Sequence, residues 1–281
     1  MIENGTITAT GGSSAAGIGA GQNGTCGNIS ISQGNVTAKG GTNAAGIGGG
    51  YDASCGSITI SGGTIDAEGG EWGAGIGCGQ ADNKSASCNN ISISGGTITA
   101  KGGNGAAGIG SGEFSHNRPI CGDISISGGT VTATGGDQAA GIGSGDNGAC
   151  GNISISQGTV TATGGDQAAG IGGGIFAICG NITINKTVTK VTATKGDKHN
   201  SFTDPYSIGI GSDDADHNIS SSACVCGSTI FDNDLYKFTL QWNHDGVNPN
   251  SWTYSPEPAS GTYGGLKLTI SGKTWTLEPT N

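Results

Sequence analysis

The chain has 281 residues, 59 of them glycine, and 21 acidic against 11 basic residues give a net charge of −10. Arg118 is the single arginine, so the basic clusters that neutralise phosphates are missing, and we exclude nucleic acid as a partner. The glycines follow no Gly-X-Y period, which excludes collagen, and no apolar run is long enough for a membrane helix, so we expect no membrane insertion.

A repeated theme of the Cys-Gly-Asn-Ile-Ser-Ile type dominates the chain up to about residue 230. Its cysteines are separated by 29, 33, 33, 29, 29 and 47 residues, and they are Cys26, Cys55, Cys88, Cys121, Cys150, Cys179 and Cys226. Each interval carries the same three segments, for example 153–156, 159–163 and 168–172, with a Gly-Gly pair between the second and the third. Self-similarity at such a fixed period is the sequence signature of a solenoid.

Alternating side chains within each segment predict which residues face inward. In one copy we expect a core of Ile153, Ile155, Val160, Ala162, Ala169 and Ile171, with the intervening serines and threonines facing solvent. Three short strands per period predict an all-β fold, a right-handed three-sided parallel β-helix (β-solenoid) with about 29–33 residues per coil. The sequence by itself leaves the handedness open.

Coil length varies mainly at one place, between the Gly-Ile-Gly segment and the next cysteine. This loop is short after Gly143 and long after Gly77, Gly110 and Gly211. Insertions confined to one corner of a solenoid often mark its binding edge. We call this place the variable corner.

From about Ile230 the period stops and aromatic residues and prolines cluster. We therefore predict two regions, 1–230 with the β-helix repeats and 231–281 as a C-terminal β cap, with strands near 236–242, 266–271 and 274–277. A cap hides the last core layer and blocks edge-to-edge association. Because Met1 falls within a repeat, we expect the chain to be part of a longer protein.

The Ala-Ala-Gly-Ile-Gly-Gly-Gly and Gly-Asn-Ile-Ser-Ile-Ser-Gly-Gly-Thr-Val-Thr-Ala-Thr patterns resemble repeats of large surface proteins from Gram-positive gut anaerobes. More loosely, they are similar to right-handed β-helix carbohydrate-binding domains of clostridia. The resemblance covers about residues 1–230. The second family implies calcium and acidic polysaccharide as ligands, but its ligand residues find no individual counterparts in this chain.

Ligand-binding candidates gather near the variable corner. They are the aromatic residues Tyr51, Trp72 and Phe114, together with Arg118. Exposed aromatic rings stack on sugar rings, and the chain is otherwise poor in aromatic residues. The alternative is that each ring packs on its neighbouring loop.

An acidic column follows the Gly-Gly turns. Asp137, Asp166 and Asp197 fall in consecutive coils, where like charges repel unless something compensates. Bound Ca²⁺ would do so through carboxylate and carbonyl oxygens, and we note these residues as a candidate metal site. Solvated turn residues are the alternative. The loop with Asp213, Asp214 and Asp216 is a weaker calcium candidate.

The cysteine column predicts a ladder of buried free thiols, because stacked strands keep the Cβ atoms farther apart than a disulfide prefers. Cys78 falls outside this column, and Cys224 is close enough to Cys226 for a local pair. A threonine array on the second strand is typical of ice-binding solenoids, but Lys39, Glu68 and Lys101 interrupt it. These three predict an ion-pair ladder instead.

Catalytic patterns are weak. Lyase chemistry needs calcium-binding carboxylates and a base, for which only Arg118 with its neighbours His116 and Glu113 offers a place. We therefore expect a non-enzymatic structural or adhesive segment of a bacterial cell-surface or secreted protein, located outside the cell, with a glycan or surface protein as partner. A calcium-dependent carbohydrate-binding module is the alternative, followed by a polysaccharide lyase or an ice-binding protein.

Overall fold

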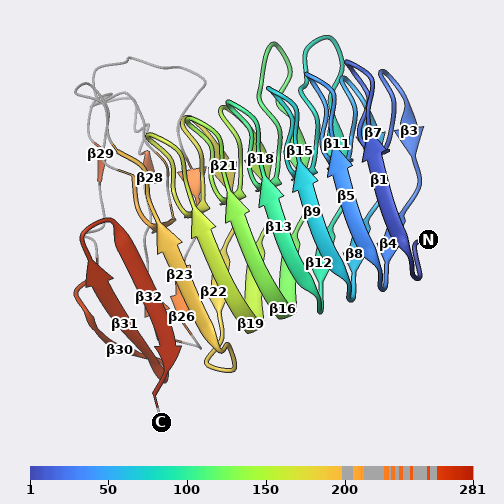
Figure 1. The fold of residues 1–281 in the computed structure, drawn as a ribbon. Helices are drawn as coiled ribbons and strands as arrows, with labels where there is room; N and C mark the ends of the chain where they lie inside the picture. The colour runs from blue at the N-terminus through green and yellow to red at the C-terminus, as the bar shows by residue number, and fades with distance from the viewer. Residues whose placement is uncertain are drawn as a thin grey trace.

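A computed structural model describes residues 1–197, 205–209, 211, 225–227, 229–231, 234–236, 241–242, 252–253 and 258–280. Within these residues the regular structure is entirely β, and the chain winds as a parallel solenoid whose coils stack side by side (Figure 1). No helix among them has the length and apolarity to cross a membrane. The predicted all-β parallel solenoid is confirmed, and the hand of the coil stays a prediction.

Four rows of strands run along the solenoid. The first row holds the Thr-x-Thr segments: β1 (Thr6–Thr10), β5 (Asn35–Lys39), β9 (Thr64–Glu68), β13 (Thr97–Lys101), β16 (Ile124–Thr134), β19 (Ile153–Thr163) and β23 (Lys190–Thr194). The second row holds the Ile-Ser-Ile segments: β4 (Ile29–Ile31), β8 (Ile58–Ile60), β12 (Ile91–Ile93), the first halves of β16 and β19, β22 (Ile182–Ile184) and β26 (Thr229–Phe231). Both rows belong to one 16-stranded sheet.

The other two rows form a sheet each, with seven strands per sheet in the described part of the chain. The Ile-Gly row consists of β2 (Ile18–Gly19), β6 (Ile47–Gly48), β10 (Ile76–Gly77), β14 (Ile109–Gly110), β17 (Ile142–Gly143), β20 (Ile171–Gly172) and β24 (Ile208–Gly209). The cysteine row consists of β3 (Thr25–Cys26), β7 (Ser54–Cys55), β11 (Ser87–Cys88), β15 (Ile120–Cys121), β18 (Ala149–Cys150), β21 (Ile178–Cys179) and β25 (Val225–Cys226). The cysteines therefore lie in short strands of their own, which the three predicted segments per coil did not include.

Parallel pairing keeps equivalent residues in register from coil to coil. Cys121 pairs with Cys150, and Ile142 pairs with Ile171. The six predicted core residues of the coil 153–171 are all 0% exposed. Their side chains fill the interior as continuous apolar columns, so each coil buries its apolar face only because its neighbours stack on it.

The cysteine ladder is present, and the seven cysteines whose side chains are described are free thiols. A hydrogen bond to the neighbouring thiol of Cys179, together with burial, raises the pKa of Cys150 well above the ordinary thiol value. Cys78 lies outside this row, as predicted, and it is also fully buried, with its thiol donating to the carbonyl oxygen of Ile120 at 3.4 Å. It occupies an inward column of small residues that directly follows the Ile-Gly strands, where Ser111 and Ser144 are also buried.

Glycine is required where the Ile-Gly strands approach one another. Gly143 has a φ of +135°, and a Cβ atom there would lie 1.9 Å from the carbonyl oxygen of Gly172. The same left-handed conformation and close approach recur in the neighbouring strands of this row, which explains why the Gly-Ile-Gly pattern repeats.

On the outer face of the large sheet, one of the two ion pairs of the predicted ladder is present. Lys39 Nζ lies 3.2 Å from Glu68 Oε2, with both side chains about half exposed. Lys101 lies opposite Glu68 in the strand register. The described residues contain no ion pair between those two, so the predicted ladder is reduced to the pair of Lys39 and Glu68.

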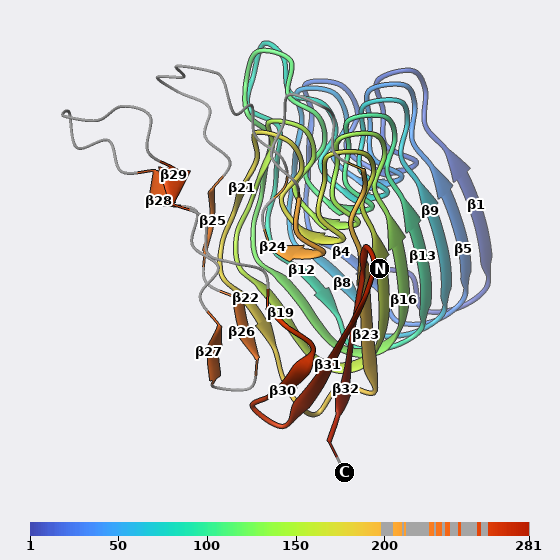
Figure 2. The ribbon, with the colours of Figure 1, turned by 90° about the vertical axis from the view of Figure 1, so that its left-hand side faces the viewer.

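The last coil is covered at the large sheet by an antiparallel addition, seen at the C-terminal end of the stack in Figures 1 and 2. Strand β32 (Thr274–Pro279) pairs antiparallel with β23, and β31 (Leu266–Ser271) and β30 (Gly261–Tyr263) extend the sheet. Trp275 lies opposite Ala193 and is 1% exposed. These strands match the predicted ranges 266–271 and 274–277, and the boundary at residue 230 stays a prediction.

The remaining predicted strand, 236–242, corresponds to two short strands. Strand β27 (Asp234–Tyr236) pairs antiparallel with β26. Strand β28 (Gln241–Trp242) pairs antiparallel with β29 (Trp252–Thr253). The residues between β27 and β28 lie outside the described part of the chain, as do Cys224 and the acidic loop 213–216.

Candidate functional site at the variable corner

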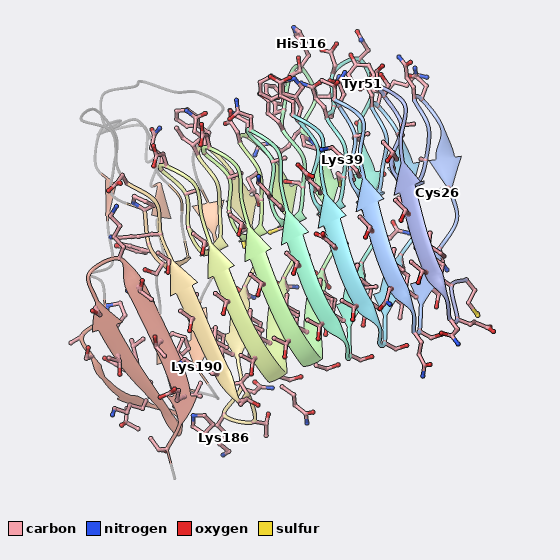
Figure 3. All side chains as sticks on the ribbon, in the orientation of Figure 1. Cys26, Lys39, Tyr51, His116, Lys186 and Lys190 are labelled. Carbon is pink, nitrogen blue, oxygen red and sulfur yellow. The ribbon has the colours of Figure 1, made fainter. Side chains whose placement is uncertain are left out.

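The variable corner is where neighbouring coils differ most. Its loop runs over 144–148 in the coil of β17 and β18, but over 78–86 and 111–119 in the two preceding coils. The longer loops project beyond the rest of the stack, and Tyr51 and His116 mark their position (Figure 3). The predicted short and long loops are confirmed here, whereas the loop after Gly211 lies outside the described residues.

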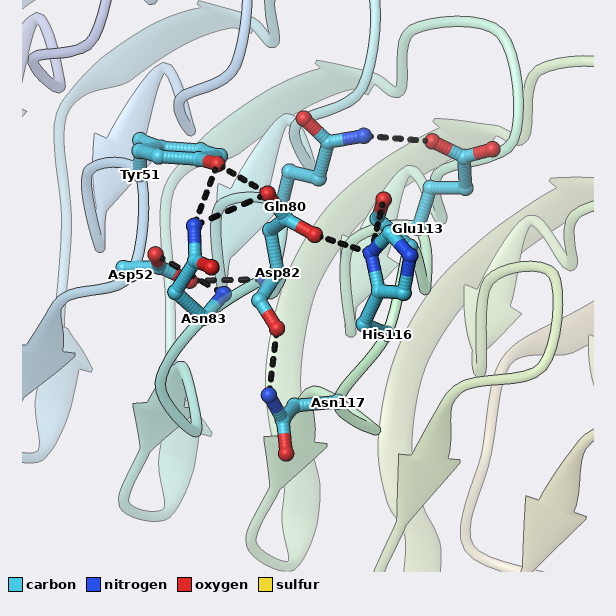
Figure 4. Close-up of polar contacts among 9 residues, drawn as sticks. Tyr51, Asp52, Gln80, Asp82, Asn83, Glu113, His116 and Asn117 are labelled. Carbon is cyan, nitrogen blue, oxygen red and sulfur yellow. Dashed lines mark hydrogen bonds and ion pairs between the residues drawn. The ribbon is translucent and has the colours of Figure 1, made fainter.

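Asp82 is the hub that holds the two projecting loops together (Figure 4). Tyr51 Oη donates to Asp82 Oδ2 at 2.6 Å, and His116 Nδ1 contacts the other carboxylate oxygen. The bond from Tyr51 and the contact with His116 lower the pKa of Asp82, and the same bond raises the pKa of Tyr51 to about 12. The carboxylate is therefore ionised at neutral pH, and the phenol is neutral.

Backbone contacts complete this hub. The backbone N–H of Asp82 donates to Asp52 Oδ1 at 2.7 Å, and that of Asn83 donates to Asp52 Oδ2 at 3.1 Å. Asn117 Nδ2 donates to the carbonyl oxygen of Asp82. One loop is thus tied to the coil before it and to the coil after it, and Tyr51 acts in this network rather than as an isolated ring.

Arg118 and Phe114 also connect coils. Arg118 Nη1 donates to the carbonyl oxygens of Gly148 at 3.1 Å and of Phe176 at 3.4 Å, so the guanidinium ties its loop to the two following coils. Phe114 is half-buried, and its backbone N–H donates to the backbone carbonyl oxygen of Asp146 at 3.1 Å. Both residues therefore have a structural role, which is to hold neighbouring coils together.

Beside the hub lies a cavity of about 150 Å³, close to the size of one sugar ring. Its lining is polar apart from one aromatic ring and one glycine, and it consists of Trp72, Asn104, Gly105, Glu113, Asp137, Gln138 and Asp146. Trp72, Gly105 and Gln138 occupy the same position in three successive coils. Because the middle one has no side chain, a space opens between the indole and the amide.

Gly105 also sets the position of Glu113. A Cβ atom at Gly105 would lie 2.6 Å from Glu113 Cγ, so only glycine lets this side chain pack over the backbone. Glu113 Oε2 accepts a hydrogen bond from Gln80 Nε2 at 2.9 Å. Asp146, which follows Glu113 in the same column, has Oδ1 bonded to Asn147 Nδ2 at 2.8 Å.

The two neighbouring carboxyl groups are partly withdrawn from water. Burial, followed by the charge of Asp146, raises the pKa of Glu113 to about 7. Burial also raises the pKa of Asp146 to about 6, although the positive charge of Arg118 acts in the opposite direction. Burial is thus the main reason that both carboxyl groups hold their protons more tightly than free carboxyl groups do.

The predicted acidic column is present as a stack of exposed side chains. The backbone N–H of Gln138 donates to the backbone carbonyl oxygen of Asp166 at 3.0 Å, and that of Gln167 to the backbone carbonyl oxygen of Asp197 at 2.6 Å, which fixes the stacking. The carboxylate of Asp197 forms an ion pair with Lys273 from the turn between β31 and β32. The described residues contain no group of three or more His, Cys, Asp or Glu side chains placed to hold a metal ion, and calcium binding at this column stays a prediction.

Of the predicted site residues, the cavity brings together Trp72 and Asp137. Tyr51, Phe114 and Arg118 lie in the adjoining network, and Asp166 and Asp197 lie further along the stack. Sequence analysis missed Asp82, which joins the two projecting loops, and it missed Gln138 and Asp146, which both line the cavity. One signal pointed to the cavity, namely Gly105 at a position where the neighbouring coils carry Trp72 and Gln138.

Comparison with known proteins supports the repeat architecture. The family model described as Beta helix repeat matches residues 1–22, 29–51, 58–80, 91–113, 124–146 and 153–175. From the second match on, each begins at an Ile-Ser-Ile or equivalent strand and ends in the variable corner, so the matched segments correspond to the stacked coils. Neither the curated proteins nor the solved structures gave a match.

Proposed function

We propose that this β-helix repeat protein is a structural, adhesive segment of a bacterial cell-surface or secreted protein, and that it holds a glycan at the variable corner without cleaving it. The repeats provide a stiff support, because every coil is paired in register with its neighbours. The projecting corner presents the cavity lined by Trp72 and Glu113 to the surroundings. The partner would be a host or environmental glycan.

The unused hydrogen-bonding groups of the cavity carry this proposal. In the described part of the chain, the side-chain amides of Asn104 and Gln138 and the indole N–H of Trp72 have no protein partner. Glu113 and Asp146 each have one carboxylate oxygen engaged and one left over. An aromatic face beside several unsatisfied donors and acceptors suits a sugar, which has apolar faces and a ring of hydroxyl groups.

Binding without catalysis is favoured by the placement of the carboxyl groups. Glycoside hydrolysis uses two carboxyl groups that flank the scissile bond. Glu113 and Asp146, the two partly buried carboxyl groups, come instead from adjacent coils of one column, so a ligand would meet these two on the same side, and the third carboxyl group, that of Asp137, is exposed. The exposed His116 contacts Asp82 and Ser115 through the same ring nitrogen. In a catalytic triad the histidine would instead bind the nucleophile with one ring nitrogen and the carboxylate with the other.

A glycan array with neutral, acidic and amino-sugar oligosaccharides tests the proposal. We expect the wild-type protein to bind and Trp72→Ala to bind at least about tenfold more weakly, since the stacking face is lost. Thr161→Ala, on the exposed outer face of β19, is the matched control and should bind like wild type. Absence of binding across the array, or equal binding by Trp72→Ala, would reject a glycan site at this corner.

The same array with a chelator separates the calcium-dependent alternative. Loss of binding in chelator, restored by added Ca²⁺, would support a metal-dependent module that uses the acidic column. Binding that is unchanged by chelator would remove calcium from the proposal. Cleavage is checked by mass spectrometry of the bound oligosaccharide, and shortened products would overturn the non-enzymatic assignment.

A further inference from the structure

We infer that the cavity between Trp72 and Gln138 selects a saccharide with a free, protonated amino group over neutral, N-acetylated and acidic sugars. The inference rests on the proposed glycan binding and adds the chemical class of the ligand. It depends on the charges that face the cavity and on which of their atoms are still available.

Negative groups face the cavity from several of the elements packed against it, whereas the turn with Asn104 and Gly105 is uncharged. Glu113 and Asp146 come from the corner loops, Asp137 lies in the lining, and the charge of Glu71 acts on Glu113 from the preceding coil. Arg118 is the cation that acts on Asp146, but its Nη1 is already bonded to two backbone carbonyl oxygens.

Lys101 lies at the neighbouring groove of about 300 Å³ together with Glu68 and Glu71. It is not part of the cavity lining. Within the described residues the cavity therefore has more negative than positive charge, and an ammonium group would restore the balance.

The available atoms match an ammonium group. Glu113 Oε2 is engaged by Gln80, and Asp146 Oδ1 is engaged by Asn147, so each carboxylate keeps one oxygen that can accept a new bond. An ammonium group has three N–H donors and no acceptor, and it can bridge two carboxylates. The face of Trp72 is attractive to a cation as well as to the apolar face of the ring that carries it.

The same arrangement disfavours the other sugar classes. A uronic acid would bring a further negative charge next to two partly buried carboxylates, which costs free energy unless a cation accompanies it. N-acetylation removes the positive charge and adds bulk in a cavity of about 150 Å³. A neutral hydroxyl group would keep the hydrogen bonds but leave the carboxylates uncompensated.

Titration calorimetry with glucosamine oligomers, their N-acetylated forms, glucose oligomers and galacturonic acid oligomers of equal length tests the inference. We expect the free amino sugar to bind at least about tenfold more tightly than the other three. At pH 6 its binding should also release a proton, measured by repeating the titration in buffers with different ionisation enthalpies, because Glu113 with a pKa of about 7 must ionise to receive the ammonium group.

Glu113→Gln keeps the shape of the side chain and should abolish the preference and reduce the proton release at pH 6 to the part contributed by Asp146, whose pKa is about 6. Glu68→Gln, on the outer wall, is the matched control and should leave both unchanged. Equal or tighter binding of a neutral, N-acetylated or acidic oligomer would overturn the inference while leaving the proposed glycan site in place. Binding of none of the four sugars would reject both.

Discussion

The wall of the solenoid and its variable corner are built in opposite ways. In the wall, Ile98, Val131 and Val160 form one column, and each pairs in parallel with the equivalent residue of the next coil. At the corner, one column contains Tyr51, Gln80, Glu113, Asp146 and Ile175, whose backbone contacts repeat but whose side chains differ and bond to different partners. Uniform columns give stability by stacking alone, whereas single departures from the repeat bring unlike polar groups together, which is what a selective site needs.

Breaking the wall should have the largest effect. Gly143→Ala places a Cβ atom 1.9 Å from the carbonyl oxygen of Gly172 at a φ of +135°, so the stacked strands must separate. We expect a loss of more than about 4 kcal/mol in the free energy of unfolding, measured by urea denaturation.

The matched control for this change is Gly21→Ala. Gly21 has no atom within 4 Å of the position of an added Cβ, so the effect should stay within about 0.5 kcal/mol. Similar losses for both variants would show that close approach of the strands is not what the repeated glycine provides.

Breaking the corner should have a smaller and local effect. Asp82→Asn removes the charge that accepts from Tyr51 and contacts His116, so the two projecting loops should open more easily. Hydrogen exchange should become about tenfold faster in residues 78–86 and 111–119 and stay unchanged in β13, β16 and β19.

Asp66→Asn, an exposed change on β9, is the matched control and should alter neither region. If Asp82→Asn accelerated exchange throughout the wall as well, the corner and the wall would have to be regarded as one cooperative unit.

Changing the pH should act on the corner alone. The pKa of Glu113 is raised from 4.5 to about 7, so above pH 4.5 the unfolded chain gives up this proton first. The contribution of Glu113 to stability should therefore be highest below pH 4.5, fall as the pH rises to about 7, and remain level above it. The half-exposed position limits the change to about 1 kcal/mol after solvent screening.

Thermal unfolding between pH 4 and 8 measures this dependence. Glu113→Gln should flatten the profile and be more stable than wild type at pH 8, with Asp146 accounting for what remains at lower pH. A profile for Glu113→Gln that still falls like the wild-type one would show that other groups control the pH dependence.

The smallest effect is expected on the outer face of the wall. Lys39→Ala removes an exposed ion pair with Glu68, which should cost at most about 0.5 kcal/mol and nothing in high salt. Urea denaturation at low and high salt measures this. A larger loss that persists in salt would mean that the aliphatic part of Lys39 packs on the wall.

Much of the wall could be predicted from the sequence because its periodicity is strict. All six residues assigned to the core of the coil 153–171 are fully buried, since alternation within a strand leaves them no other side. Cys78 shows the limit of this reasoning. It follows a strand whose last residue is a glycine with positive φ, so the chain turns and directs the next side chain inward.

The corner could be located from the sequence, but its contacts could not. Loop length marked it, and Trp72 was found as an aromatic residue in an aromatic-poor chain. That Glu113 meets Asp146, or that Arg118 binds carbonyl oxygens of the following coils, depends on loop conformations that no periodicity encodes. Aligning the coils by column, rather than reading them one after another, would have singled out the missing side chain at Gly105.

Coils of unequal length nevertheless keep their cysteine strands in register from Cys55 through Cys88 and Cys121 to Cys150. Added residues are accommodated at one corner, so duplicated repeats can diverge there without disturbing what they share. In evolution, the sequence and length of the corner loops can therefore change while the strands of the wall stay the same. For protein engineering, the loops after Gly77, Gly110 and Gly143 are adjacent insertion points where foreign peptides could be displayed at a fixed spacing on one scaffold.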